Sequence, residues 1–183
     1  MKSRRIAFWI LLVVTVAVYA LMVNWTLPLI AGHADGLRPF DLKPIGYDYA
    51  EAKAFLTALT PEGAAFYLRV QHTLDSIYPA LLAATLFFAI VMIAPKALGI
   101  WRWVIALIAI PGAVFDYLEN AAVSAMIAAG PDGLTETEVA GASLWTVLKS
   151  AFDTIAFVVV LVFVVVWVFS RRGSSKAPGA TPA

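Results

Sequence analysis

The sequence predicts an all-α integral membrane protein: a four-helix bundle with a short amphipathic helix in its first outer loop. Three observations lead to this fold class. Of the 183 residues, 62% are hydrophobic and 14% are charged, which is typical of integral membrane proteins. The apolar residues lie in four blocks, each long enough to cross a hydrocarbon core, which needs about 20 apolar residues in a helix. Basic residues gather in alternate connecting segments.

The four predicted spans make up a single membrane domain over residues 1–172, followed by a disordered cytoplasmic tail over residues 173–183. The first span starts with MKSRR before a long apolar run, as a signal peptide does. Signal peptide cores have about 7 to 15 apolar residues, and this run is longer, so we expect an uncleaved helix. The spans cover about residues 6–30, 70–94, 99–127 and 143–170.

The distribution of Lys and Arg predicts which side of the membrane each loop faces. The amino-terminal tail, the turn between the second and third spans, and the carboxyl-terminal tail carry eight basic residues and no acidic one. Residues 31–69 carry four basic and five acidic residues. Because basic loops stay in the cytoplasm, both termini are predicted to be cytoplasmic in a multi-pass protein of the cell membrane, of the bacterial inner membrane type.

The long outer loop contains the predicted short helix, at about residues 49–59. Asp48 provides an N-cap with Glu51 three residues later, and apolar residues follow at helical spacing. A Thr-Pro pair then starts the second span. The short helix either rests on the outer membrane surface or forms a lid over a pocket, with the Gly- and Pro-rich residues 31–46 as a flexible approach.

The third span contains charged residues in an otherwise apolar stretch, PGAVFDYLENAAVSAM. Asp116, Glu119 and Asn120 share one helical stripe. At 1.5 Å per residue they lie about 18 to 24 Å from the inner end of the span, in the outer half of the bilayer. The other spans carry polar residues at or near this depth, namely Asn24, His72, Asp75, Tyr78, Lys149 and Asp153.

These polar residues are predicted to face the bundle interior as one layer. An ionised side chain that faces lipid near the midplane costs roughly 2.5 to 3.5 kcal/mol or more. Carboxylates outnumber Lys149, and that excess requires a carboxyl that holds a proton, a bound cation or metal, or contact with outside water. The alternative is that the polar residues only hold the helices together through hydrogen bonds.

The layer is therefore a predicted site with three groups of candidate residues. The candidate acid–base catalysts are Asp75, Asp116, Glu119 and Asp153. The candidate ligand contacts are Asn24, His72, Tyr78, Asn120 and Lys149. An internal ion pair with Asp153 is the alternative role for Lys149. The candidate metal ligands are His72, Asp75, Asp116 and Glu119, from the one-turn spacing in HTLD and DYLEN.

Two elements of this layer also carry a resemblance to known proteins. LDSIYPALL contains Asp75, Tyr78 and Pro79, and FDYLENAA contains Asp116, Glu119 and Asn120. Over about residues 47–125 the chain resembles a group of small, functionally uncharacterised four-span bacterial membrane proteins with a D-x-x-Y-P element on one span and a D-x-x-E-N element on the next. The resemblance implies no activity. It implies that the two elements act together.

Two classes of function follow from the sequence. The protein binds or processes a lipophilic or cationic ligand in the acidic pocket, or it is a non-enzymatic accessory subunit of a larger membrane complex. The expected partners are the lipid bilayer, such a ligand, or another membrane protein, and nothing points to nucleic acid. The absence of cysteine excludes thiol catalysis and thiolate metal sites. The sequence has no nucleophile motif or phosphate loop, so it identifies neither an enzymatic reaction nor a cofactor.

Overall fold

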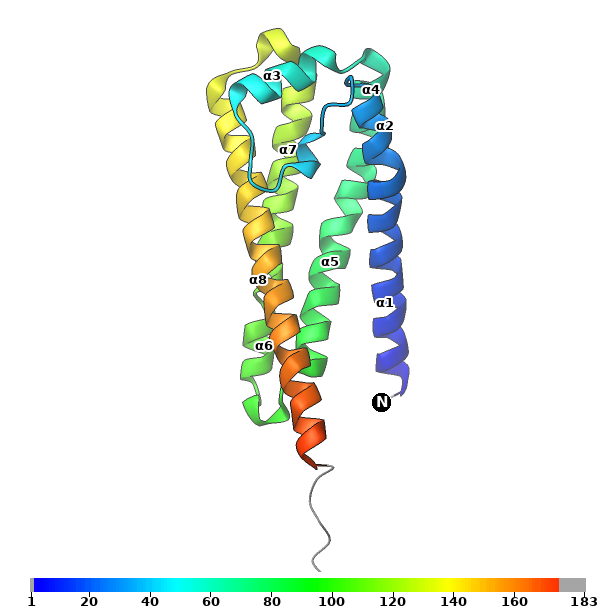
Figure 1. The fold of residues 1–183 in the computed structure, drawn as a ribbon, viewed down its shortest axis with the longest axis vertical. Helices are drawn as coiled ribbons and strands as arrows, with labels where there is room; N and C mark the ends of the chain where they lie inside the picture. Colours follow the sequence, from blue (N-terminus) through cyan, green and yellow to red (C-terminus); the bar gives the residue numbers. More distant parts are fainter. Residues whose placement is uncertain (1, 175–183) are drawn as a thin grey trace, which may run out of the picture.

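The computed structural model describes residues 2–174, with side chains to residue 170, and within that range the chain is helical without strands (Figure 1). Four long helical units are apolar enough to cross a membrane, which supports a multi-pass membrane protein and confirms the predicted all-α bundle. The units are Lys2–Gly32, Pro61–Ile93, Trp101–Gly133 and Glu136–Ser170.

Three of these units are interrupted. The first contains α1 (Lys2–Leu21), the π-helical η1 (Met22–Thr26) and α2 (Leu27–Gly32). The second contains α4 (Pro61–Phe66), the π-helical η3 (Tyr67–Gln71) and α5 (His72–Ile93). The third contains α6 (Trp101–Ala106) and α7 (Ala109–Gly133), and the fourth is α8 (Glu136–Ser174). The connections contain η2 (Phe40–Leu42), α3 (Tyr49–Ala58) and η4 (Lys96–Leu98).

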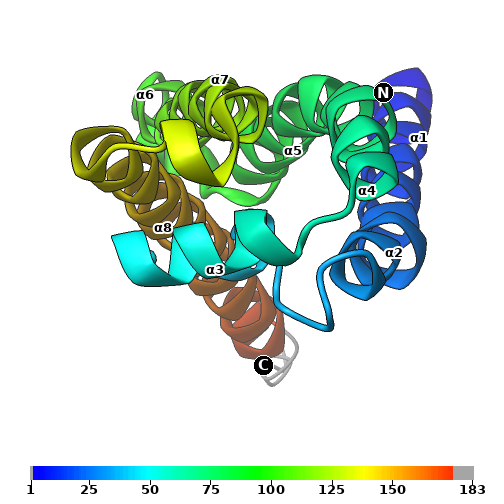
Figure 2. The same cartoon turned by 90° about the horizontal axis from the view of Figure 1, so that it is seen from above.

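The helices pack so that α5 and α7 form the centre of the bundle. Helix α5 contacts α1, α7 and α8, and α8 also packs along α7. Helix α1 lies at the edge beside α5 (Figure 2), and Thr15 is the buried residue of α1. Most apolar side chains of α1 are exposed, as expected for a helix that contacts lipid on most of its surface.

Local sequence explains how α3 and α4 begin. The Asp48 carboxylate accepts from the Glu51 backbone N–H (2.8 Å), and the Glu51 carboxylate accepts from the Asp48 backbone N–H (3.2 Å), which is the predicted capping box. The Thr60 hydroxyl accepts from the Gly63 N–H (3.1 Å), with Pro61 at the first helical position. These caps turn the chain across the end of the bundle that α3 covers (Figure 2), called the α3 end below.

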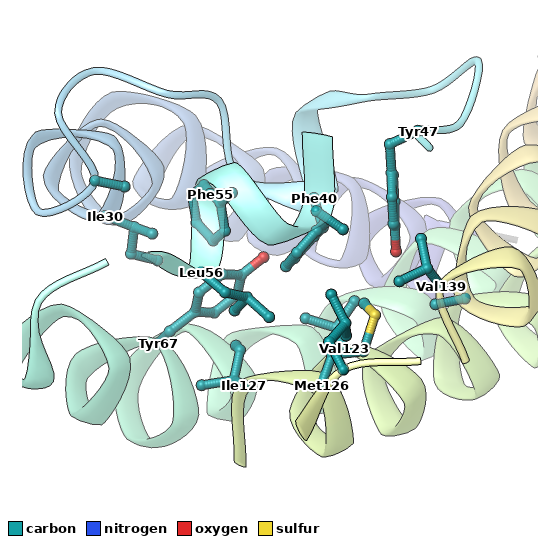
Figure 3. Packing of buried hydrophobic residues seen from close by; sticks show 14 residues of the cluster. Ile30, Phe40, Tyr47, Phe55, Leu56, Tyr67, Val123, Met126, Ile127 and Val139 are labelled. Atoms are coloured by element: carbon teal, nitrogen blue, oxygen red, sulfur yellow. The ribbon is translucent and has the colours of Figure 1, made fainter. Parts of the chain in front are cut away.

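Helix α3 packs on the other helices at the end of the bundle. Its buried residues, Ala52, Phe55 and Leu56, join a cluster with residues of α7 and α8 (Figure 3). Phe40 is completely buried in this cluster, with its ring 4.7 Å from that of Tyr47 and 4.9 Å from that of Phe55. The apolar face of α3 therefore packs on the bundle instead of on the membrane surface, and its role as a lid over a pocket stays a prediction.

The loop between α2 and α3 differs from the flexible approach expected for residues 31–46. Helix α2 continues to Gly32, and the chain then runs into the bundle, where η2 lies between α7 and α2 in the view of Figure 1. Phe40 is completely buried and holds this segment in place. No periodic pattern in the sequence predicts that the segment is folded. Of the predicted tail at residues 173–183, residues 173 and 174 end α8, and the remainder lies outside the described residues.

Candidate functional site

The predicted stripe on α7 forms the centre of a buried polar layer. Asp116, Glu119 and Asn120 are all buried, and Glu119 is 1% exposed. Their spacing of three and four residues directs them to the side of α7 that packs on α5 and α8. The sequence therefore predicted the interior face of α7 correctly.

Lys149 on α8 lies between the two carboxylates of α7. Its ammonium group pairs with Glu119 Oε2 and lies 3.4 Å from Asp116 Oδ1. Glu119 Oε1 accepts from the Thr146 hydroxyl at 2.6 Å. The predicted alternative, an ion pair within α8 between Lys149 and Asp153, is replaced by these pairs across the helix interface. Glu119 is thus the more tightly held carboxylate.

Asp116 is held more loosely. Besides Lys149 at 3.4 Å, it accepts from the Asn120 side-chain amide at 3.2 Å. Charge-assisted hydrogen bonds are usually about 2.7 to 2.9 Å long. Both contacts exceed that length, so the Asp116 carboxylate retains capacity to accept from a further donor.

A second set of hydrogen bonds connects α5 to its neighbours. The Asn120 amide also donates to the Asp75 backbone oxygen (3.0 Å), which links α7 to α5. The Gln71 amide donates to the Asp75 carboxylate (3.0 Å), and Thr26 on η1 donates to the Gln71 side-chain oxygen. Asp75 therefore lies in the predicted layer, held by Gln71, a residue that the predicted α5 stripe did not include.

Asp153 reaches the layer because Gly112 opposes it. A Cβ atom on Gly112 would lie 2.1 Å from Asp153 Oδ1 and 3.5 Å from the Asp153 backbone nitrogen. Glycine therefore leaves room for the Asp153 carboxylate, whereas the distance to the Asp153 backbone is an ordinary van der Waals contact. Gly112 is therefore the small residue of the α7 stripe because the Asp153 carboxylate occupies the space beside it.

The remaining predicted ligand contacts have separate surroundings. His72 pairs through Nδ1 with the Ser124 hydroxyl at 3.1 Å, between α5 and α7. Tyr78 stacks on Tyr19 of α1, with ring centroids 5.9 Å apart. Asn24 does not join the layer, because it is exposed and its amide donates to the Ala20 backbone oxygen of its own helix (2.8 Å).

Helical spacing explains the error at Asn24. The first unit has five buried residues, Thr15, Met22, Thr26, Leu27 and Ile30. All but Leu27 follow at intervals of seven, four and four residues, which defines one face. Asn24 is nine residues from Thr15, on the opposite face at 100° per residue. Thr26 is the polar residue of this unit that enters the network.

The loop between α2 and α3 contributes two residues that were not predicted. Asp41, in η2, accepts a hydrogen bond from the Tyr67 hydroxyl, and its carboxylate lies within electrostatic range of Asp75, Asp116 and Glu119. Tyr47 extends its ring from the loop towards the helices, with its hydroxyl at the far end (Figure 3). These loop residues complete the layer at the α3 end.

The Tyr47 hydroxyl has no hydrogen-bond partner among the described residues. Tyr47 is 7% exposed, and its hydroxyl lies near Thr146 and Glu119 without meeting either in hydrogen-bond geometry. Burial, and next the charge of Glu119, raises the pKa of this hydroxyl well above its usual range. The phenol therefore stays protonated. A buried polar group without a partner is uncommon in proteins and marks a position where a ligand could bind.

The candidate metal ligands do not converge. Within the part of the chain that the structure describes, no three His, Cys, Asp or Glu side chains are grouped closely enough to hold a metal ion. Asp116 and Glu119 face Lys149, and His72 faces Ser124. Within the described residues, the four candidates therefore do not form one ligand set.

Comparison with known proteins adds no assignment. No protein-family model, curated protein or solved structure matches the chain.

Proposed function

We propose that the protein binds a positively charged lipophilic molecule at the acidic layer. The observation that carries this proposal is the imbalance of charge. The layer has one ammonium group, that of Lys149, which contacts Asp116 and Glu119. Asp75 and Asp153 lie within electrostatic range of it, and Asp41 adds a fifth carboxylate from the loop. Charges withdrawn from water are stable only when they are paired, so a second cation fits this layer.

Asp116 is the proposed contact for that cation. Glu119 is already paired with Lys149 and Thr146, whereas both neighbours of Asp116 are more than 3 Å away. The layer lies among helices whose outer surfaces are apolar, so a ligand that arrives from the membrane must be lipophilic. Acid–base chemistry on the bound molecule by Asp75, Asp116, Glu119 or Asp153 stays a prediction.

The proposal includes an orientation. The basic residues of the termini and of the α5–α6 turn indicate that these segments face the cytoplasm of a bacterial cell. The α3 end then faces the outside, and the acidic layer lies in the outer half of the bilayer. The resemblance to four-span bacterial proteins with D-x-x-Y-P and D-x-x-E-N elements is consistent with this proposal, since both elements contribute to the layer.

The test uses octylammonium chloride as a soluble lipophilic cation and 1-octanol as its uncharged analogue. Octylammonium should raise the thermal stability of the purified protein in detergent, because a ligand at 100 times its Kd stabilises the folded state by about 2.7 kcal/mol. Octanol should not. The Asp116→Asn variant keeps the Lys149–Glu119 pair, so it should fold and lose at least half of this stabilisation.

Asp132→Asn is the matched control, since it removes an equal charge from an exposed residue outside the layer. It should respond to octylammonium as the parent does. Equal stabilisation by octylammonium and octanol, or equal responses of the Asp116 and Asp132 variants, would overturn the proposal. A stoichiometric membrane protein that co-purifies with a chain insensitive to octylammonium would favour the accessory-subunit alternative.

A further inference from the structure

The end of the bundle opposite α3 carries positive charge without any acidic residue beside it in the sequence. Residues 1–34, 76–115 and 154–183 contain eight Lys and Arg residues and no Asp or Glu. Those within the described residues lie near the start of α1, in the turn from α5 to α6, on α6 and near the end of α8. Figure 1 shows these parts together at the end opposite α3, called the basic end below. The segments that form the basic end therefore supply no carboxylate to neutralise it.

Arg102 on α6 is enclosed more than other basic residues of this end. It is partly buried, whereas Arg4 and Lys96 are exposed. It precedes Ile105 and Ala106 by three and four residues, so the three side chains share one face of α6. This face is directed at the bundle, because Ala106 is completely buried.

The cluster around Ala106 joins three helices just above Arg102. Ala106 packs with Ile90 and Val91 of α5, and Phe163 of α8 lies against the same cluster. Arg102 lies one turn closer to the basic end than Ala106. Its side chain therefore begins at the edge of an apolar cluster between α5, α6 and α8.

The charge of Arg102 is partly withdrawn from water and is not paired. The Nε atom is buried and has no hydrogen-bond partner among the described residues. The Cζ atom lies 5.8 Å from the centre of the Trp103 ring. Because the residue as a whole is only partly buried, the far end of the guanidinium remains at the surface. A charge in such a position is stable when it is paired, so the site fits an anion from outside the chain.

The surface around Arg102 indicates where this anion comes from. Trp101, Trp103 and Val104 are 63%, 40% and 46% exposed, and the third membrane unit begins at Trp101. Tryptophan is enriched at the level of the lipid headgroups. Arg102 therefore lies at the depth where headgroup phosphates are found, beside an apolar surface that acyl chains can cover.

We infer that Arg102 binds the phosphate of an anionic phospholipid, such as phosphatidylglycerol, from the leaflet at the basic end. The accessible end of the guanidinium donates two parallel N–H bonds to phosphate oxygens, an arrangement that arginine favours. The acyl chains lie along the exposed surface of α6, and the other basic residues of this end add attraction at longer range. This site lies apart from the proposed cation site, and neither statement depends on the other.

Net charge distinguishes this lipid from the zwitterionic lipids of a bilayer. Phosphatidylcholine carries the same phosphate, but its quaternary ammonium cancels the charge within the headgroup. Phosphatidylglycerol has no such cation, so its phosphate gains more from pairing with a guanidinium. The preference between the two lipids is therefore the quantity to measure.

Native mass spectrometry of the full chain, released from nanodiscs with equal amounts of the two lipids, measures this preference. The parent should retain one phosphatidylglycerol with a preference of about tenfold or more. Arg102→Met keeps an apolar stem of similar length, and it should lower the preference to about threefold or less. Arg102→Gln repeats the test with a neutral polar side chain and should give the same loss.

Arg4→Met is the matched control, since it removes the same charge from an exposed position at the same end. It should keep most of the preference of the parent. Equal retention of the two lipids by the parent would overturn the inference. Equal losses in the Arg102 and Arg4 variants would show attraction by the whole basic end and no site at Arg102, which also contradicts it.

A second measurement distinguishes a lipid from free phosphate. Phosphatidylglycerol added to the parent in detergent should raise its unfolding temperature, and it should have little effect on Arg102→Met. Sodium phosphate should act no differently from sodium chloride at the same ionic strength. Stabilisation of the parent by inorganic phosphate to the same extent as by the lipid would refute the assignment to a phospholipid.

Discussion

Replacing Lys149 with Met removes the one ammonium group between Asp116 and Glu119. Met retains most of the side-chain volume, so the change acts mainly on charge. Removing one partner of a buried ion pair costs about 3 to 5 kcal/mol, because the other charge stays buried without compensation. Glu119 is 1% exposed, but it keeps its hydrogen bond from Thr146, and the Lys149 side chain is itself 15% exposed. We therefore expect Lys149→Met to lower the free energy of unfolding by about 3 kcal/mol, the lower end of this range.

A compensating substitution makes this estimate testable. In the Lys149→Met variant the Glu119 carboxylate has no cation beside it. Glu119→Gln removes this unpaired charge, and the glutamine side-chain oxygen can still accept a hydrogen bond from Thr146. The double variant should recover about 2 kcal/mol relative to Lys149→Met, since a neutral pair of similar volume is often tolerated in place of a buried ion pair. Free energies of unfolding in mixed micelles, followed by circular dichroism, measure both changes. Lys96→Met, at an exposed position, should stay within about 0.5 kcal/mol of the parent.

The refuting result is a double variant no more stable than Lys149→Met. That outcome would mean that Lys149 and Glu119 are not energetically coupled, and that the charges of the layer are compensated in another way. A loss below about 1 kcal/mol for Lys149→Met alone would mean that water already reaches the carboxylates.

Two further predictions concern helix packing and orientation. Gly112→Ala should lower stability by about 1 to 3 kcal/mol, because the new Cβ overlaps Asp153 Oδ1 at 2.1 Å; in an Asp153→Ala background the same change should be neutral or stabilising, and an equal loss in both backgrounds would contradict the contact. For orientation, a cysteine at Ser3 should resist a membrane-impermeant thiol reagent in intact cells, whereas one at Asp132 should react, and the reverse pattern would invert the proposed topology.

The sequence predicted most reliably those features that depend on lipid. Charged residues are so costly in hydrocarbon that the α7 stripe could only face inwards, and the structure agrees for Asp116, Glu119 and Asn120. The prediction for Asn24 was wrong because a single polar residue does not define a helix face. Its side-chain amide instead donates a hydrogen bond to the backbone of its own helix. The π-helical segments η1 and η3 were also not predicted, since they leave no distinct pattern in the sequence.

Residues of the loop could not be assigned from the sequence for a different reason. Asp41 follows Phe40, and its position results from the packing of that ring between Tyr47 and Phe55. Such packing depends on residues distant in the sequence, and neither helical periodicity nor loop composition encodes it. The Gly and Pro content that suggested a flexible segment instead allows the tight turns of a folded one, such as Gly46 against Ser143.

The same packing connects α3 with the charged groups of the layer. Phe40 is buried beneath α3, and its neighbour Asp41 bonds to Tyr67 within electrostatic range of Asp75, Asp116 and Glu119. The Tyr47 ring packs against Phe40 in a tilted arrangement, and its hydroxyl lies near Glu119. A displacement of α3 that moved Phe40 would therefore withdraw one carboxylate and one hydroxyl from the layer together. Two polar groups of the layer therefore depend for their placement on the packing of this one ring.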